Sequence, residues 1–291
     1  MDIVGIEQSW RAQQRARRLA TLGYGVVLLI CLAISAKIAD VTPAALMAGV
    51  PRVGEYFVKI TPTLHWAHLF GGVKTEGSFA FWFYRLDSWA WLMFETSQIA
   101  ALATLGGSIT GFVLCFAGTR NLAPNLATYV IVRRGLELFR TVPDIVYALI
   151  LVWAFGVGPL AGILAIAAHT TGAMGKLFAE AVENADMRPW EAIRATGGTW
   201  AQGVRYAILP QVLPNFLSYA LLRLEINVRG AAVIGFVGAG GIGEELLLAI
   251  RKFFYSDVSA ILLLVAICVM VIDLASEHIR HRLLTIEVGK T

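Results

Sequence analysis

The chain has 291 residues, of which 57% are hydrophobic and only 15% are charged, and its formal net charge is +4. A soluble globular chain carries about 25% charged residues. The uncharged residues gather into long stretches, such as 19–36, 96–119 and 258–272, and about 18 apolar residues can cross a bilayer as a helix. The composition excludes an ordinary soluble domain and predicts an all-α integral membrane protein.

The first predicted transmembrane helix covers roughly residues 19–37. It is longer than the apolar core of a signal peptide, and no small-residue cleavage site precedes Lys37, so we expect a retained anchor. Four arginines between residues 11 and 18 precede it. Because Lys and Arg are enriched on the cytoplasmic side, we expect a cytoplasmic N-terminus. Residues 38–90 would then form an external segment rich in aromatic side chains.

Five further spans are predicted along the rest of the chain. The third contains Pro143, which removes a backbone hydrogen bond and predicts a kink or a new helix start. Basic residues fall in both inner loops and in the C-terminal tail, so we expect both termini in the cytoplasm. The five spans cover roughly residues 92–117, 133–155, 160–180, 211–234 and 257–275.

A glycine-rich string, "GFVGAGGIG", follows the fifth span and contains the pattern GxGxxG. In a dinucleotide-binding fold this pattern lies between a strand and a helix within alternating strands and helices, and no such series surrounds it here. Glycine also permits backbone conformations that a Cβ forbids. We therefore expect an irregular or re-entrant segment packed at the outer mouth, the alternative being a flexible external turn. The candidate gate or packing positions are Gly238, Gly240, Gly241 and Gly243.

The loop over residues 181–208, which we expect in the cytoplasm, contains a short predicted helix. Pro189 suits the first helical turn, and Gly197 suits the C-terminus. A helix of about two turns does not persist alone in water, so it would be ordered by docking. Trp190 and Ile193 share one face and could form an apolar knob for a partner, the alternative being an inert loop.

This loop resembles the membrane subunits of ATP-binding-cassette (ABC) importers. Their signature is EAA, three residues, Gly, nine residues, and I-x-L-P, and "EAIRATGGTWAQGVRYAILP" at 191–210 departs from it at Ile193 and Ala207. The resemblance implies a type I importer permease fold and a coupling helix that docks on an ATPase subunit. The coupling positions would be Pro189, Trp190, Glu191, Ala192, Ile193, Gly197, Leu209 and Pro210.

Residues 90–282 more specifically resemble phosphonate importer permeases, as in "EINVR" followed by "GAGGIG". The resemblance implies a bacterial inner-membrane protein that works as a homodimer with two ABC ATPase subunits and an external binding protein. ATP and Mg²⁺ would bind those ATPases, with no cofactor, metal or catalytic residue here. The domains would be 1–90, the transmembrane core 91–282 and a tail 283–291. Phosphate, phosphite or an amino acid such as methionine remain alternative cargoes.

Charged and polar residues within the spans are candidates for the translocation pathway, because charge at membrane depth is costly and needs a partner or a function. Glu225 and Arg229 are spaced to pair on one helix face, while Arg223 lies on another face and could attract an anion. A membrane-embedded enzyme would require a cluster of His, Asp or Glu, and His169 and Glu225 are isolated. The pathway candidates are Arg140, Pro143, Arg223, Glu225, Asn227 and Arg229.

Overall fold

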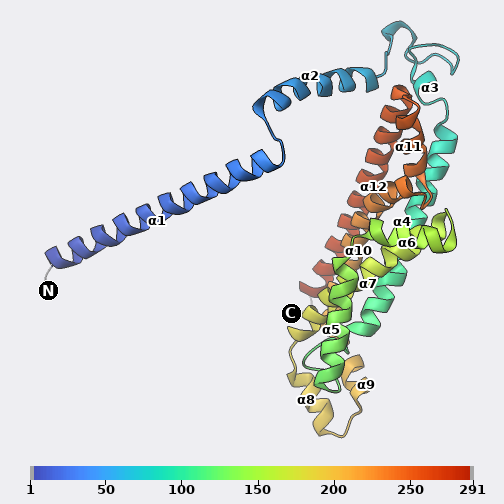
Figure 1. Ribbon diagram of the computed structural model, residues 1–291. Coiled ribbons are helices and arrows are strands. Elements are labelled where there is room, and N and C mark those ends of the chain that lie inside the picture. The colour runs from blue at the N-terminus through green and yellow to red at the C-terminus, as the bar shows by residue number, and fades with distance from the viewer. Residues whose placement is uncertain (1–2, 289–291) are drawn as a thin grey trace. The chain divides into compact units, whose positions relative to one another are not determined.

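The computed structural model describes residues 3–288, and within them every regular element is helical. The chain divides into two compact units, with the boundary between Ile60 and Thr61. The first unit contains α1 (Ile3–Ile38) and α2 (Pro43–Ile60). The second unit is a helical bundle (Figure 1). Its elements are η1 (Trp66–His68), α3 (Phe79–Trp82), α4 (Leu86–Cys115), α5 (Leu126–Thr141), α6 (Asp144–Phe155), α7 (Pro159–Glu183), α8 (Arg188–Ala195), α9 (Trp200–Gly203), the π-helical η2 (Val204–Ile208), α10 (Leu209–Ile234), η3 (Gly235–Val237), α11 (Ile242–Arg251) and α12 (Tyr255–Val288).

The segment between Ile60 and α4 belongs to the bundle, although the sequence placed a domain boundary at residue 90. Trp82 Nε1 donates to the backbone oxygen of Ser256 at 3.1 Å, and Tyr84 donates to Asp257 at 3.1 Å. These bonds hold the stretch before α4 against the start of α12. The compact unit therefore begins well before the second predicted span.

Four helices are individually long and apolar enough to cross a membrane, and two bent helix pairs raise the number to six. This agrees with the six predicted spans and confirms the all-α membrane fold. The single helices contain the segments Gln13–Ile38, Leu86–Cys115, Pro159–Glu183 and Tyr255–Arg282, and the bent pairs are Leu126–Thr141 with Asp144–Phe155 and Trp200–Val237 with Ile242–Arg251.

The break predicted at Pro143 is a sharp one. The axes of α5 and α6 meet at 87°. Val142 is extended, as the residue before a proline prefers to be. His169 of α7 lies against the break, with its Nδ1 3.0 Å from the backbone oxygen of Val142. The histidine is therefore bonded within the core, and Pro143 starts a new helix rather than bending one.

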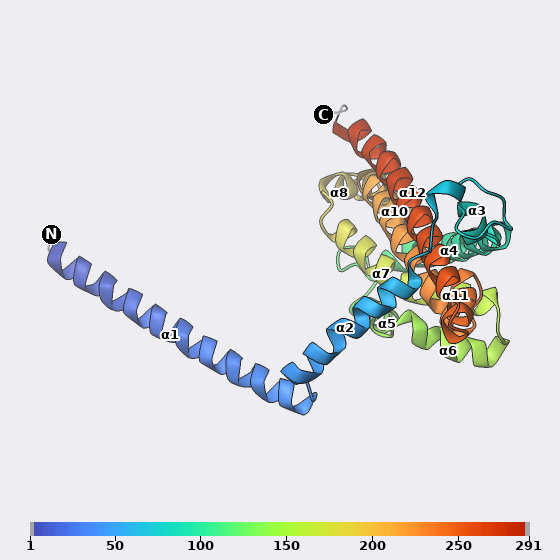
Figure 2. The same ribbon diagram turned by 90° about the horizontal axis from the view of Figure 1, so that it is seen from above.

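The bundle is built around a close contact between α4 and α7, which lie side by side in Figures 1 and 2. A Cβ on Gly107 would lie 2.6 Å from the Thr170 side chain, and one on Gly111 would lie 2.8 Å from the backbone nitrogen of Gly175. Small residues at a helix crossing let two backbones approach closely, as they do in membrane proteins generally. This crossing fixes the two helices that carry the buried threonines described below.

Two regions of the bundle differ in structure. We call residues 181–208 the loop end, and we call residues 235–243, at the break between α10 and α11 within one bent span, the glycine end. At the loop end a cluster of apolar side chains, including Phe178 stacked on Phe216 at 4.1 Å, fills the space under the loop. At the glycine end the chain leaves α10, passes through η3 and enters α11, a helix that the sequence analysis did not predict.

Candidate functional site

The helix at the loop end has the predicted start and end. Pro189 lies in the first turn of α8, and Gly197, with φ +85°, ends it in the left-handed conformation that favours glycine. Gly197 and Gly198 donate backbone hydrogen bonds to Arg194 and Ile193 at 3.1 and 2.9 Å. The helix has eight residues and buries none of them. The residues at its two ends, Pro189 together with Gly197 and Gly198, therefore define where this helix starts and stops.

One side chain of α8 does not point where the sequence suggested. Trp190 packs against the apolar cluster of the loop end, and its ring meets Trp200 edge to face at 6.4 Å. A Cβ on Gly203 would lie 2.5 Å from the Trp190 ring. The prediction of a free Trp190 knob is therefore wrong, because the indole ring is held by this chain. The exposed surface of α8 is formed by Arg188, Pro189, Glu191, Ala192, Arg194 and Ala195.

The loop end is bonded firmly to α10. Gln211 accepts from the backbone N–H of Asp186 at 2.9 Å and donates to the backbone oxygen of the same residue at 3.0 Å. Leu209 and Pro210 begin α10 directly after the π-helical η2, so the missing proline N–H falls where the helical hydrogen-bonding pattern changes. The two Gln211 bonds tie the chain just before α8 to the first turn of α10.

A buried polar cluster crosses the middle of the bundle and joins α4, α7 and α10. Asn227 Nδ2 donates to Thr104 Oγ1 at 2.8 Å and to Thr170 Oγ1 at 3.0 Å. Arg223 Nε donates to the same Thr170 hydroxyl at 3.3 Å. Buried polar groups need such partners, because each unsatisfied one costs free energy. Of these four residues, Arg223 and Asn227 were predicted from the sequence.

The charged candidates on α10 separate into two groups. Glu225 lies 3.7 Å from Arg280 and Arg229 lies 3.8 Å from Asp273, so both make ion pairs with α12. The predicted side-chain pair between Glu225 and Arg229 is therefore wrong, because each of them has a residue of opposite charge beside it on α12. Arg229 Nε instead contacts the backbone oxygen of Glu225 at 3.3 Å.

Arg223 differs from these residues in having no ion pair. Among the described residues no carboxylate lies within salt-bridge distance of it, although the more distant charge of Asp144 acts on it. It is half-buried and borders an apolar recess of about 190 Å³ between α7 and α10. Arg140 is exposed, and no hydrogen bond or ion pair joins its side chain to the described residues. Neither arginine therefore forms an ion pair within the described part of the chain.

The glycine end is packed, as the sequence predicted, and is not a flexible turn. The N–H of Ile242 donates to Thr96 Oγ1 at 2.8 Å, and Gly158 donates to the backbone oxygen of Gly238 at 2.9 Å. A Cβ on Gly241 would lie 2.4 Å from Thr96 Oγ1, and one on Gly243 only 1.9 Å from the backbone oxygen of Ala232. At these positions glycine is required by close contact.

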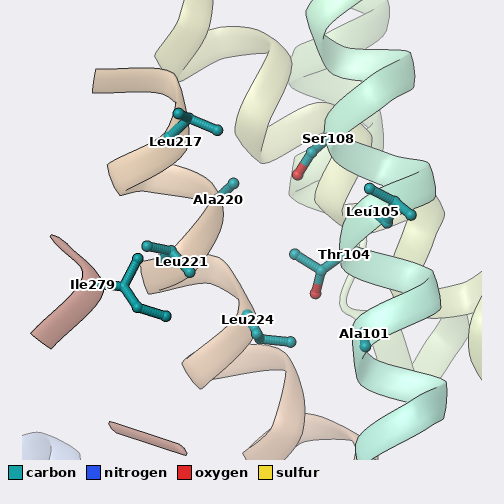
Figure 3. Close-up of a pocket in the computed structure, with 9 residues that line it drawn as sticks. All are labelled: Ala101, Thr104, Leu105, Ser108, Leu217, Ala220, Leu221, Leu224 and Ile279. Carbon is teal, nitrogen blue, oxygen red and sulfur yellow. The ribbon is translucent and has the colours of Figure 1, made fainter. Parts of the chain in front are cut away.

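An apolar pocket of about 440 Å³ opens between α4, α10 and α12, beside the polar cluster (Figure 3). Thr104 and Ser108 supply its polar atoms, and the Ser108 hydroxyl is buried without a hydrogen-bond partner. The residues that line the pocket are Ala101, Thr104, Leu105, Ser108, Leu217, Ala220, Leu221, Leu224 and Ile279.

Sequence reasoning missed the threonines of the site. Thr96, Thr104 and Thr170 are buried, and each accepts a bond from another segment. A signal was present in α4, where Thr96, Ala100 and Ala103 repeat at the helical spacing of three and four residues. That pattern of small residues marks a packed helix face in a membrane protein.

Comparison with known proteins identifies the family. The family described as "Binding-protein-dependent transport system inner membrane component" matches residues 103–284. The chain belongs to this family. The match covers the polar cluster, α8 and the glycine end. The chain is therefore a transport subunit and a multi-pass inner-membrane protein, and its role is transport rather than catalysis.

Individual relatives and structures agree with the family. The phosphite transport system permease protein PtxC of Stutzerimonas stutzeri is 35% identical over 257 residues, covering 88% of this chain and 86% of that protein. The phosphate-import permease protein PhnE of Mycolicibacterium smegmatis is 37% identical over 193 residues, covering 66% of this chain and 36% of that protein. The inward-facing MetNI methionine ABC transporter shares the fold, with a TM-score of 0.57 and 23% identity over 69% of this chain and 98% of its own.

Proposed function

We propose that the chain is the membrane subunit of an ATP-driven importer for a phosphorus oxyanion such as a phosphonate, phosphite or phosphate. Two copies would enclose the pathway, an external binding protein would deliver the anion at the glycine end, and two ABC ATPase subunits would dock at the loop end. Both termini would lie in the cytoplasm. Relatives named for phosphite and phosphate transport support this class of cargo.

The observation that carries the proposal is the exposure and attachment of α8. The helix buries no residue of its own, yet Trp190 packs it against the bundle, and Gln211 holds Asp186 just before the helix. A short helix with this arrangement can receive a displacement from a partner and pass it to α10. The matched motif residues Glu191, Ala192 and Gly197 lie on or beside its exposed surface, which supports a role in contact with the ATPase.

Arg223 is the best candidate for contact with the anion. It is the arginine of α10 without a carboxylate partner within salt-bridge distance in the described part of the chain, whereas Arg229 pairs with Asp273. Its bond to Thr170 holds the guanidinium in place and leaves further N–H donors for an oxyanion. A single partly solvated arginine attracts an anion weakly, and weak binding suits a protein that must release its cargo.

The alternative functions make different demands on the structure. Methionine import would use the same fold, so the cargo has to be decided by experiment. A membrane-embedded enzyme would need clustered catalytic groups, and within the described residues no three His, Cys, Asp or Glu side chains gather as a metal site would require. The family assignment favours transport.

The cargo can be tested by reconstituting the complete transporter in proteoliposomes. Binding proteins loaded with a phosphonate, phosphite, phosphate or methionine would be added outside, and ATP hydrolysis would be measured inside. We expect a binding protein loaded with a phosphorus oxyanion to stimulate ATP hydrolysis, and we expect Arg223→Gln to weaken that stimulation. Stimulation by methionine alone would contradict the proposed cargo.

Coupling can be tested at Gly197, where an added Cβ would point into open space. Gly197→Ala introduces only the cost of a positive φ, about 1 kcal/mol, and serves as the control. Gly197→Trp adds bulk on the proposed docking surface. We expect the Trp variant to lose ATPase binding and uptake while the Ala variant retains most of both. Undiminished complex formation by Gly197→Trp would contradict the docking role.

A further inference from the structure

The helix α2 carries its large apolar side chains on one face and its charged ones, all in its second half, on the other. At about 100° per residue, the apolar residues fall within an arc of about 160° and the charged residues within an arc of about 60° on the opposite side. The apolar face consists of Leu46, Met47, Val50, Val53, Phe57, Val58 and Ile60, and the charged face of Arg52, Glu55 and Lys59.

The apolar face is exposed to a degree that is unusual for such a pattern. Leu46, Val50 and Val53 are 61%, 71% and 56% exposed, and α2 contains no buried residue. The helix is also not among the candidate spans, since its charged face would have to enter hydrocarbon. A strongly two-sided helix of modest overall hydrophobicity is typical of helices that lie in the membrane interface.

A short connection keeps α2 close to the bilayer. The span in α1 ends at Ile38, and α2 starts at Pro43. The four residues between them can reach at most about 14 Å even when extended. They are also ordered: Val41 donates to the backbone oxygen of Ala36 at 2.9 Å, and the Thr42 hydroxyl caps α2 by accepting from Ala45 at 3.1 Å. The start of α2 therefore cannot move far from the edge of the hydrocarbon core.

We propose that α2 is an interfacial helix that lies in the membrane surface on the side where α1 ends. Leu46, Val50 and Val53 enter the boundary between headgroups and acyl chains, and Arg52 points to the lipid phosphates and water. The lipid is favoured over a protein partner because the span and the short connection bring α2 to a bilayer in every state of the molecule. The assignment depends neither on the coupling role of α8 nor on the cargo.

The test uses the full-length chain in lipid nanodiscs, with Cys31, Cys115 and Cys268 replaced by alanine. A nitroxide label is attached to a new cysteine at Val50 or Val53, or at Ala48 or Glu55 on the charged face. Its collisions with oxygen, which enters lipid, are compared with those of a water-soluble nickel chelate. We expect the oxygen-to-nickel ratio to be several-fold higher at Val50 and Val53 than at Ala48 and Glu55. A separate variant that keeps Cys31 in α1 as its one cysteine gives the reference ratio for a label in lipid.

Two outcomes would overturn the proposal. High nickel access at all four sites would mean a solvated helix, and low access to both reagents at Val50 and Val53 would mean that a protein covers the face. A matched pair then tests cause: with the label at Val50, Val53→Asp should lower the ratio several-fold, while Ala48→Asp should leave it unchanged. Equal effects of the two substitutions would also overturn it, and if Val53→Asp does not fold, the four labels decide alone.

Discussion

The glycine end and the loop end require their glycines for different physical reasons. At the glycine end, a hypothetical Cβ would collide with the Thr96 hydroxyl at Gly241 and with the backbone oxygen of Ala232 at Gly243. At the loop end, a hypothetical Cβ on Gly197 would meet no atom of the described chain within 4 Å beyond the neighbouring residues, and glycine is required only by its φ of +85°. Packing within this chain thus explains Gly241 and Gly243. The surface around Gly197, in contrast, makes no close contact with the rest of the described chain.

This difference separates two kinds of motif. A glycine string can be dictated by close contact, as it is between Gly243 and Ala232. The exposed face of α8, which no other part of the described chain covers, is better explained by a partner. The comparison therefore predicts that substitutions at the glycine end act on folding and that those on the exposed face of α8 act on assembly.

The largest expected effect is that of Gly243→Ala. The new methyl group would lie 1.9 Å from the backbone oxygen of Ala232, which cannot move without displacing α10. Overpacking of this kind costs about 3 kcal/mol or more, so we expect little monodisperse protein and a much lower unfolding temperature in detergent. Gly106→Ala is the control, because open space surrounds Gly106. Equal stability of the two variants would mean that the glycine end is not packed.

Two neighbouring residues of α8 sharpen the comparison at the other end. Trp190 packs on this chain, so Trp190→Ala should destabilise the isolated subunit by about 2 kcal/mol, less than a fully buried Trp. Ala192 is exposed, so Ala192→Arg should change stability by about 0.5 kcal/mol or less. At a central interface position it should nevertheless weaken ATPase binding by about 2 kcal/mol. Thermal unfolding and ATPase pull-down measure the two effects, and the same loss in both assays for Ala192→Arg would contradict the division.

The sequence predicted the features that depend on local chemistry. The break at Pro143 and the end of α8 at Gly197 follow from the backbone preferences of those residues. The direction of Trp190 and the partners of Glu225 and Arg229 could not be predicted, because they depend on which helices become neighbours. The helix α11 did leave a local signal, since Glu244 in its first turn and Arg251 in its last complement the helix dipole.

The polar cluster of Asn227, Thr104 and Thr170 lies between the loop end and the glycine end. We expect its hydrogen bonds to contribute less to stability than the contacts of Gly243 or Trp190. Asn227→Leu removes the donor to Thr104, and Thr104→Val removes the acceptor while keeping the shape. Hydrogen bonds between membrane helices average about 0.6 kcal/mol in double-mutant cycles, and we expect a coupling of that size in thermal unfolding. A coupling near zero would mean that α4 and α10 are held by packing alone. Uptake assays on the same variants would show whether the cluster also affects transport.

The smallest expected effect concerns an ion pair beside the glycine end. Arg85, before α4, pairs with Glu245 of α11, and both side chains are partly exposed. Burial and the nearby Asp257 carboxylate raise the pKa of Tyr84, so this phenol remains a donor to Asp257 at neutral pH. An exposed ion pair contributes about 0.5 kcal/mol and is screened by salt. The double-mutant cycle of Arg85→Gln and Glu245→Gln should therefore give a small coupling that disappears in high salt. A large coupling that salt does not change would mean that this pair, and not only the glycine contacts, keeps α11 against α4.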